Sequence, residues 1–221
     1  MSPELLAMIG WSTLDTLRMV ALAGLFGTLI GLPLGIFLAT SRAGELLPAP
    51  VANRLVGLVV NATRSTPFII LVVAIVPLTR LIAGTSIGTA AATVPLTIAA
   101  VPFIARVVEA AVREVDQGLI EAARAFGASP LQIVRKVLLP EALPAVTLAL
   151  TLTLVSLIGY SAMVGAVGGG GLGDLGIRYG YQRFMPDVML VVVLVLIALV
   201  QGVQSIGDTL ARRLDKRSRR S

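Results

Sequence analysis

The sequence contains no cysteine and no histidine. Without cysteine the chain has neither disulfides nor thiol chemistry, and without histidine it lacks the commonest general base and metal ligand. A convergent set of nucleophile, base or metal ligands is therefore hard to build from this chain. We expect a protein that is not an enzyme by itself and that holds neither a metal nor a cofactor.

Charged residues are also scarce. They make up 14% of the 221 residues, whereas soluble domains average about 25%. Hydrophobic residues account for 56% of the chain, and the mean hydropathy is +0.92. A soluble fold of this length needs many charges to cover its outside, but here the charges gather between long uncharged runs. This clustering is typical of a membrane protein.

Several apolar runs approach 20 residues, the length at which a helix crosses a hydrocarbon core of about 30 Å. They predict an all-α, polytopic membrane fold of about five transmembrane helices, forming one transmembrane domain over residues 1–221. The predicted spans are 19–41, 55–78, 88–108, 142–167 and 188–207. Prolines inside or at the edges of these runs are expected to form kinks or span ends, because neighbouring helices can satisfy the freed carbonyls. They are Pro33, Pro67, Pro77, Pro95, Pro102 and Pro144.

The distribution of Arg and Lys predicts the orientation of these spans. If the C-terminus is cytoplasmic, the inner segments hold Arg42, Arg54, Arg113, Arg124, Arg135, Lys136 and six basic residues between 212 and 220, while the outer segments hold only Arg18, Arg80, Arg178 and Arg183. Cytoplasmic segments carry the excess of basic residues, so we expect the N-terminus outside and the C-terminus inside. Arg64 and Arg106, near the cytoplasmic ends of their predicted spans, are expected to extend towards lipid headgroups.

The two ends of the chain have simple interpretations. Residues 1–18 carry Glu4 and Asp15 and lack the basic region of a cleaved signal peptide, so we read them as part of the working protein. The net charge of +6 comes largely from the basic residues at 212–220. We interpret these as a tail beside the membrane rather than as a nucleic-acid-binding segment.

The longest predicted cytoplasmic segment, residues 109–141, reads as two short helices. Residues 121–126 favour a helix, and Gly127 can adopt the left-handed conformation that ends it. The second helix is expected to stop by Pro140. From the residues alone, this segment could equally be an amphipathic hairpin that lies at the membrane surface.

The start of the second helix is clearly marked. Ser129 offers an N-cap, and Pro130 occupies the first helical position, where its missing N–H costs nothing. Gln132 completes a capping box with Ser129. The pattern predicts a rigid helix-turn-helix.

A spaced motif crosses this segment. Glu121-Ala122-Ala123 is followed by Gly127 and then by the run from Val137 to Pro140. The pattern resembles the E-A-A motif of bacterial ABC import permeases, with Val137 where the family usually has Ile. The resemblance implies that the segment forms a coupling helix docked in a cleft of an ATPase subunit. The residues that would carry this role are Glu121, Ala122, Ala123, Gly127, Ser129 and Pro130.

The chain has only two lysines, Lys136 and Lys216, and neither follows the G-x-x-x-x-G-K-[ST] pattern of a phosphate-binding loop. Gly168 to Gly171 is not preceded by a predicted strand or followed by lysine, so nucleotide binding there is not expected. We read this glycine run as a short, conformationally free outer loop. ATP hydrolysis must then be supplied by another subunit.

Segments beyond the loop resemble the methionine-uptake permeases, over about residues 24–208. They are 64–71, 94–97, 102–106, 159–163, 165–173 and 178–181. The resemblance implies the type I ABC importer permease fold in a bacterial inner membrane. It also implies a homodimer joined to two ATP-binding cassette ATPase subunits and fed by a methionine-binding lipoprotein. Members of this subfamily import methionine, often both enantiomers.

Tyr160, Ser161 and Met163 are the predicted pore residues, since they precede the glycine-rich outer loop. A tyrosine and a methionine suit an apolar thioether substrate, although sulfur–aromatic contacts contribute only about 0.3–1.5 kcal/mol. The alternative for Tyr160 and Met163 is that they pack a helix interface. An import permease for another amino acid or small solute also remains open. A proton- or sodium-driven carrier is disfavoured, because no acidic residue lies deep inside a predicted span.

Overall fold

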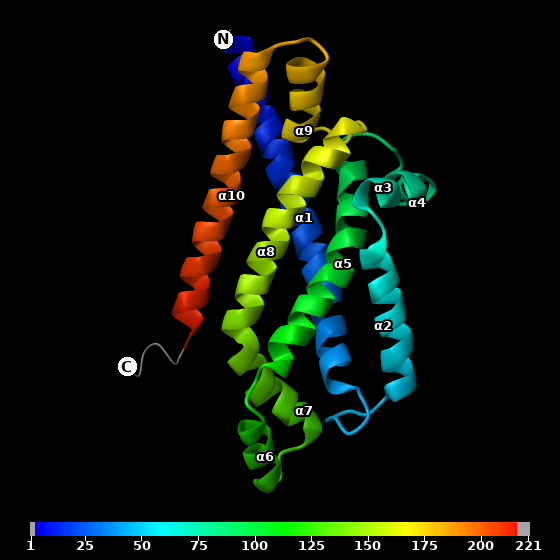
Figure 1. The fold of residues 1–221 in the computed structure, drawn as a ribbon, viewed down its shortest axis with the longest axis vertical. Coiled ribbons are helices and arrows are strands. Elements are labelled where there is room, and N and C mark those ends of the chain that lie inside the picture. Colours follow the sequence, from blue (N-terminus) through cyan, green and yellow to red (C-terminus); the bar gives the residue numbers. More distant parts are fainter. Residues whose placement is uncertain (1–2, 216–221) are drawn as a thin grey trace.

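The computed structural model describes residues 3–215, and in that range it contains helices and no strand. Long apolar helices run along the molecule (Figure 1): α1 (Pro3–Thr40), α5 (Thr89–Arg113), α8 (Leu139–Ala166) and α10 (Pro186–Leu214). They number 4 by length and composition, or up to 5 if a bent pair is counted as one span. The expected all-α polytopic fold is confirmed.

The molecule has two distinct ends. The lower end, as drawn in Figure 1, holds α6 (Gln117–Ala125), α7 (Pro130–Ile133) and the connection from α1 to α2. The upper end holds the start of α1 and α9 (Gly171–Leu175). We use these two names for the ends below.

The second span, expected over 55–78, corresponds to the bent pair. Helix α2 (Pro50–Ser65) ends before Pro67, and α3 (Phe68–Ala74) leaves at an angle of 103°. Proline has no N–H to donate, and it disfavours the helical conformation in the residue before it. Here that residue is Thr66, which is extended, with φ −79° and ψ 126°. A second short helix, α4 (Val76–Ala83), then closes at Gly84. Pro67, which was expected to form a kink or a span end, separates α2 from α3.

Helix α1 packs closely against α5 through glycines spaced four residues apart. A Cβ atom added to Gly27 would lie 2.7 Å from the Ala100 Cβ, and one added to Gly31 would lie 2.8 Å from the Val101 carbonyl oxygen. At Gly35 the added atom would lie 2.6 Å from the Ala105 carbonyl oxygen. Small residues at such spacing let two membrane helices approach backbone to backbone.

The helix that begins at Pro130 does not stop by Pro140, contrary to expectation. It continues through a π-helical turn, η1 (Val134–Leu138), directly into α8. A π-turn pairs each N–H with a carbonyl five residues back, which widens the helix just before the proline. The wider turn accommodates Pro140 at the start of α8, where its missing N–H is tolerated.

The upper end is held by the glycine-rich segment rather than left free. The Leu172 N–H donates to the Thr16 hydroxyl of α1 at 2.9 Å, and the Gly88 N–H donates to the Gly168 carbonyl at 2.8 Å. A Cβ on Gly171, which has φ +73°, would lie 2.5 Å from the Met19 side chain. The expectation of a conformationally free loop is therefore wrong: glycine serves here for close packing.

The basic residues separate between the two ends. Arg42 follows α1 in the lower connection, Arg113 ends α5, and Arg124 lies in α6, all at the lower end. Helix α10 also ends there, with Arg212 and Arg213 in its last turn. At the upper end, Arg178 lies in the π-helical turn η2 (Gly176–Tyr181), and Arg183 lies in the connection before α10. Lys216, Arg217, Arg219 and Arg220, which also entered the prediction of orientation, lie outside the described residues.

Candidate functional site

The turn between α6 and α7 has the geometry predicted for it. Gly127 has φ +76°, its N–H donates to the Arg124 carbonyl at 2.9 Å, and the Ala128 N–H donates to the Ala123 carbonyl at 3.0 Å. These two bonds form a Schellman motif, in which a left-handed glycine satisfies the last carbonyls of a helix. The start of α6 is capped by Asp116, whose side chain accepts from the Gly118 N–H at 2.9 Å.

The capping box at the start of α7 is confirmed. The Gln132 N–H donates to the Ser129 hydroxyl at 3.4 Å, and the Ser129 N–H donates to the Gln132 side-chain oxygen at 2.8 Å. Pro130 stands at the first helical position, as the sequence predicts. Both ends of the turn are thus fixed by local hydrogen bonds, which makes the pair of helices a rigid unit.

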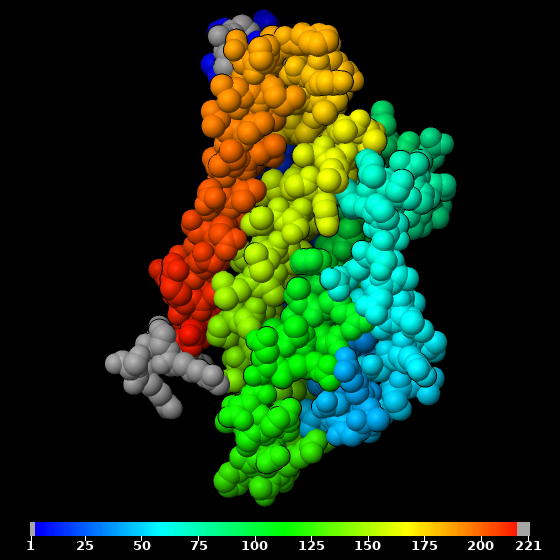
Figure 2. Space-filling model, in the orientation of Figure 1, coloured from blue at the N-terminus to red at the C-terminus, as the bar shows by residue number. Residues whose placement is uncertain are grey.

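One side of this unit is anchored, and the other is exposed. Ile120, Ile133 and Val134 are buried in the main hydrophobic core. By contrast, Glu121, Ala122, Gly127, Ser129 and Pro130 are exposed, and Ala123 is half-buried. Figure 2 shows the segment projecting at the lower end beyond the rest of the molecule.

Phe126, at the tip of the unit, was not among the predicted site residues. Its side chain is 92% exposed, and Leu131 beside the turn is 53% exposed. An exposed aromatic ring beside other apolar groups on a rigid projection is typical of a protein–protein contact. The sequence offers one signal for it, an aromatic residue directly before the capping glycine.

The predicted pore residues lie near the upper end of α8, but they do not share one face. Tyr160 stacks on Phe68 of α3, with ring centroids 4.4 Å apart and an interplanar angle of 14°. Met163 is 48% exposed. Ser161 is buried, and its hydroxyl donates to the Ile158 carbonyl at 2.7 Å. The structure therefore places Met163 on an open side of the subunit and Ser161 in its core, while Tyr160 is half-buried between Phe68 and the main core.

A cluster of ion pairs holds the lower ends of α1, α2 and α5 together. The Glu109 carboxylate is 7% exposed and pairs with Arg42 at 2.8 Å, with Arg106, and with Arg113 at 3.8 Å. Arg106 also donates to the Asn61 side chain at 2.8 Å and to the Gly57 carbonyl at 3.0 Å. Arg106 is thereby fixed by protein groups, and extension to lipid headgroups is not needed to explain it.

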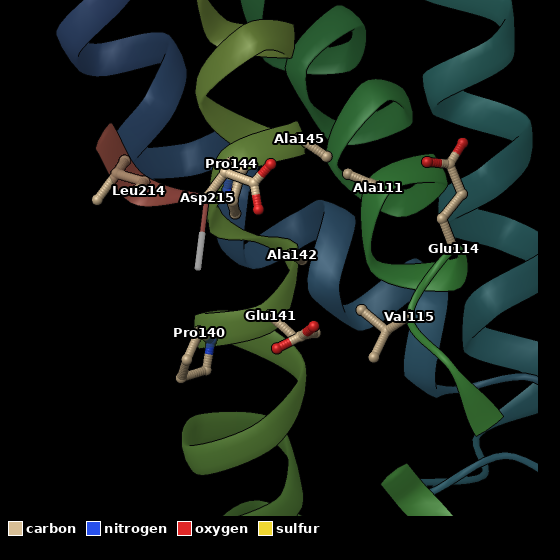
Figure 3. A pocket seen from close by; sticks show the side chains of 10 residues that line it. All are labelled: Ala111, Glu114, Val115, Pro140, Glu141, Ala142, Pro144, Ala145, Leu214 and Asp215. Carbon is tan, nitrogen blue, oxygen red and sulfur yellow. The ribbon is translucent and has the colours of Figure 1, made fainter. Parts of the chain in front are cut away.

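Clefts open near the lower end, and two of them differ in charge. The first, of about 220 Å³, lies between the ends of α5 and α10 and the start of α8, and Figure 3 shows the acidic side chains of Glu114, Glu141 and Asp215 among its lining residues. The second, of about 460 Å³, lies between α2, the connection before it and α5. Arg42, Arg54 and Arg106 line the second cleft, together with Asn53 and Asn61. Of these two clefts, the second has the charge to attract an anionic group.

A metal-binding cluster is not found in the part of the chain that the structure covers. Within residues 3–215, no group of three His, Cys, Asp or Glu side chains could hold a metal ion. The arrangement that is present is a rigid projecting turn at one end of a helical membrane bundle.

Comparison with known proteins gives consistent matches. Residues 31–220 match the family model described as the binding-protein-dependent transport system inner membrane component. The chain is 57% identical over 206 residues to the probable D-methionine transport system permease protein MetI of Vibrio cholerae, covering 93% of this chain and 92% of the relative. It is 56% identical over 151 residues to the D-methionine transport system permease protein MetI of Escherichia coli K12, covering 68% and 70%.

Solved structures agree with these matches. A chain of the MetNI methionine ABC transporter in an inward-facing conformation superposes with a TM-score of 0.95 and 50% identity, over 98% of this chain and all of that one (100%). A chain of an amino acid ABC transporter reaches a TM-score of 0.76 at 20% identity, over 96% of this chain and 100% of that one. At that identity the second likeness extends to the fold alone.

Proposed function

Because this chain belongs to the family of binding-protein-dependent transport system inner membrane components, we propose that it is the membrane-spanning permease subunit of an ATP-driven methionine importer. The observation that carries the proposal is the agreement along 98% of the chain, at 50% identity, with a subunit of a methionine ABC transporter. The curated relatives described above, which are named as D-methionine permeases, support the same substrate. The subunit accepts L-methionine and also D-methionine.

ATP hydrolysis is performed by two separate ATP-binding cassette subunits that dock on the lower end. The supporting features are the fixed turn between α6 and α7, the exposed Glu121, Ala122 and Phe126, and the buried Ile120 and Ile133 that tie the turn to the core. The α6–α7 segment must be rigid to transmit movement from the ATPase to the helix bundle. The Schellman motif and the capping box together make it rigid. The protein itself is then a transport subunit and not an enzyme.

The pathway lies on the two-fold axis of a homodimer. A single subunit of this kind cannot enclose a pore, whereas two copies place the same helices on both sides of an axis. Met163, half-exposed near the upper end of α8, would face its twin there and form a gate above Tyr160. Methionine is unbranched and flexible, so a pair can seal an apolar gate and yield when the helices separate. Ser161 supports the helix from within and does not line the pathway.

The subunit lies in the bacterial inner membrane with the lower end in the cytoplasm. The separation of basic residues between the two ends supports this orientation, since cytoplasmic segments carry the excess of Arg and Lys. Substrate is delivered at the upper end by an extracytoplasmic methionine-binding lipoprotein, and lipid surrounds the bundle.

Growth complementation tests the proposal in cells. A methionine auxotroph that lacks methionine uptake would express this chain with its ATPase and binding-protein partners, and growth on limiting L- or D-methionine would be measured. Growth that depends on all three components is expected. No growth on methionine, together with ATP-dependent uptake of a different amino acid, would assign the same machinery to another substrate.

A further inference from the structure

Helix α2 has a polar side that extends from the lower end towards the middle of the bundle. Arg54, Gly57, Asn61 and Arg64 fall within one sector of the helix, because successive residues are about 100° apart. Another sector of the exposed surface carries apolar side chains. These are Val51, Leu55, Leu58, Val59 and Ala62. The exposed surface of α2 is thus divided lengthwise into a polar and an apolar half.

Arg64 lies deep within the span. It is 14 residues beyond Pro50, the lower end of α2, which at 1.5 Å per residue is about 21 Å along the helix. Its neighbour Phe103 lies ten residues before Arg113, the lower end of α5, or about 15 Å along that helix. Half of a hydrocarbon core is about 15 Å, so Arg64 is near mid-membrane. The expectation that the Arg64 side chain reaches the lipid headgroups does not fit a position near mid-membrane.

The guanidinium of Arg64 lies near an aromatic ring and forms no ion pair with a carboxylate of the described residues. Its Cζ lies 5.8 Å from the centre of the Phe103 ring, and no ion pair joins it to any acidic residue between 3 and 215. The helix break directly after it leads to Phe68, which is stacked on Tyr160. An exposed arginine at mid-membrane is costly against lipid, and such residues face water-filled cavities and mark substrate pathways.

The polar side of α2 is continuous with the basic cleft at the lower end. Arg54, Gly57 and Asn61 line that cleft, whose volume is about 460 Å³, and Asn61 is one turn below Arg64. The polar residues of the cleft thus continue along α2 to Arg64, just before the helix break.

We propose that Arg64 binds the carboxylate of the transported amino acid, at the inner end of an aqueous track formed by the polar side of α2. This assignment rests on the proposed function as a methionine importer. A guanidinium can hold a carboxylate through two parallel hydrogen bonds, and the rings of Phe68, Phe103 and Tyr160 suit the thioether side chain. The positive residues lower in the cleft would attract the carboxylate as the substrate leaves.

Thiol labelling of the assembled transporter tests the track, and the chain suits this test because it has no native cysteine. Arg64→Cys and Asn61→Cys should react with charged, water-soluble methanethiosulfonates. Ala62→Cys, roughly 160° around the helix from Arg64, is the matched control and should react about tenfold more slowly or less. Equal rates at Ala62→Cys and Arg64→Cys would overturn the track.

Reconstituted uptake tests the role of Arg64 itself. In liposomes that hold the full transporter, Arg64→Gln should lower kcat/KM for methionine by about tenfold or more, because a charged hydrogen-bond partner is lost, and Arg64→Lys should recover part of it. Arg80→Gln, an arginine of α4 whose side chain contacts Ser86, should leave uptake unchanged. Uptake by Arg64→Gln equal to that of the native protein would overturn the proposal.

A second comparison avoids any folding defect, since the charge is changed after assembly. Labelling Arg64→Cys with an aminoethyl reagent adds a positive charge, and labelling it with a sulfonatoethyl reagent adds a negative one. We expect several-fold faster methionine uptake with the positive adduct, and equal uptake would contradict the proposal. If the native transporter carries no methionine at all, the proposed substrate fails instead, while the labelling pattern still tests the track.

Discussion

Gly127 is the residue on which the geometry of the projecting turn depends. Its φ of +76° lies in the left-handed region, and a Cβ there would meet nothing within 4 Å. The constraint is thus one of backbone conformation and not of space. Left-handed backbone costs an ordinary residue roughly 1–2 kcal/mol, and more when the side chain is β-branched.

We therefore expect Gly127→Val to deform the turn and to lower ATP-coupled transport strongly, with the membrane bundle intact. Gly127→Asn is the matched variant, because asparagine tolerates the left-handed region and the site has room for it. Transport and co-purification with the ATPase would be measured for both. If Gly127→Val assembles and transports like the native protein, the turn does not couple the two subunits.

For single residues, the sequence predicted the structure where the conformation depends on neighbouring residues alone. Gly127, Ser129 and Pro130 could be predicted, because turn and cap chemistry depends on a few neighbouring residues. The exposure of Phe126, the burial of Ser161 and the depth of Arg64 could not, because they depend on how whole helices pack. The roles of Tyr160 and Met163 in a pathway stay predictions.

Among the elements, α1 depends on its glycines. A Cβ atom added to Gly31 would lie 2.8 Å from the Val101 carbonyl oxygen and 2.9 Å from the Ile104 side chain, both in α5. Gly10, in the same helix, has nothing within 4 Å. Comparing substitutions at Gly31 and Gly10 therefore separates the effect of packing from the effect of helix propensity.

Gly31→Leu should force α1 away from α5 and destabilise the bundle by about 1–3 kcal/mol, as overpacking typically does. Gly10→Leu should leave stability unchanged or slightly raised, because leucine is the better helix former. Thermal unfolding in detergent, followed by loss of the monodisperse species, would measure both. Equal melting of the two variants would show that α1 is not held by its glycine face.

The element boundaries show what hydropathy can and cannot predict. The runs over 88–108, 142–167 and 188–207 correspond to α5, α8 and α10. An apolar run of that length in a membrane must pair its own backbone N–H and C=O groups, and a helix does so. The run over 55–78 is equally apolar, yet it turns by 103° at Thr66-Pro67. Hydropathy contains no information about direction, and the course of α3 depends on a distant contact, the stack between Phe68 and Tyr160.

The whole molecule has an orientation that can be checked directly. We expect reporters fused after residue 215 and inserted near Ser129 to be active in the cytoplasm, and one inserted in the upper connection near Arg183 to be active outside. The reason is the excess of basic residues at the lower end. An external reporter that is active near Ser129 would invert the orientation and remove the ATPase contact from that turn.

The homodimer is tested by joining its two copies. Met163→Cys should form a cross-link between subunits, because the half-exposed side chains would face each other across the axis, and no native cysteine competes. Leu81→Cys, in α4, is the control, since its side chain is 82% exposed on a different helix. Absence of a Met163→Cys cross-link in any nucleotide state, with normal uptake by Met163→Ala, would remove Met163 from the gate.

ATP-dependent accumulation of methionine in proteoliposomes tests the central claim most directly. The purified chain would be reconstituted with its ATPase, with the lipoprotein and labelled methionine on the side of the upper end and ATP on the side of the lower end. The account predicts accumulation above the external concentration that requires ATP and the binding protein. Methionine that only equilibrates, or that enters equally well without ATP, would contradict it.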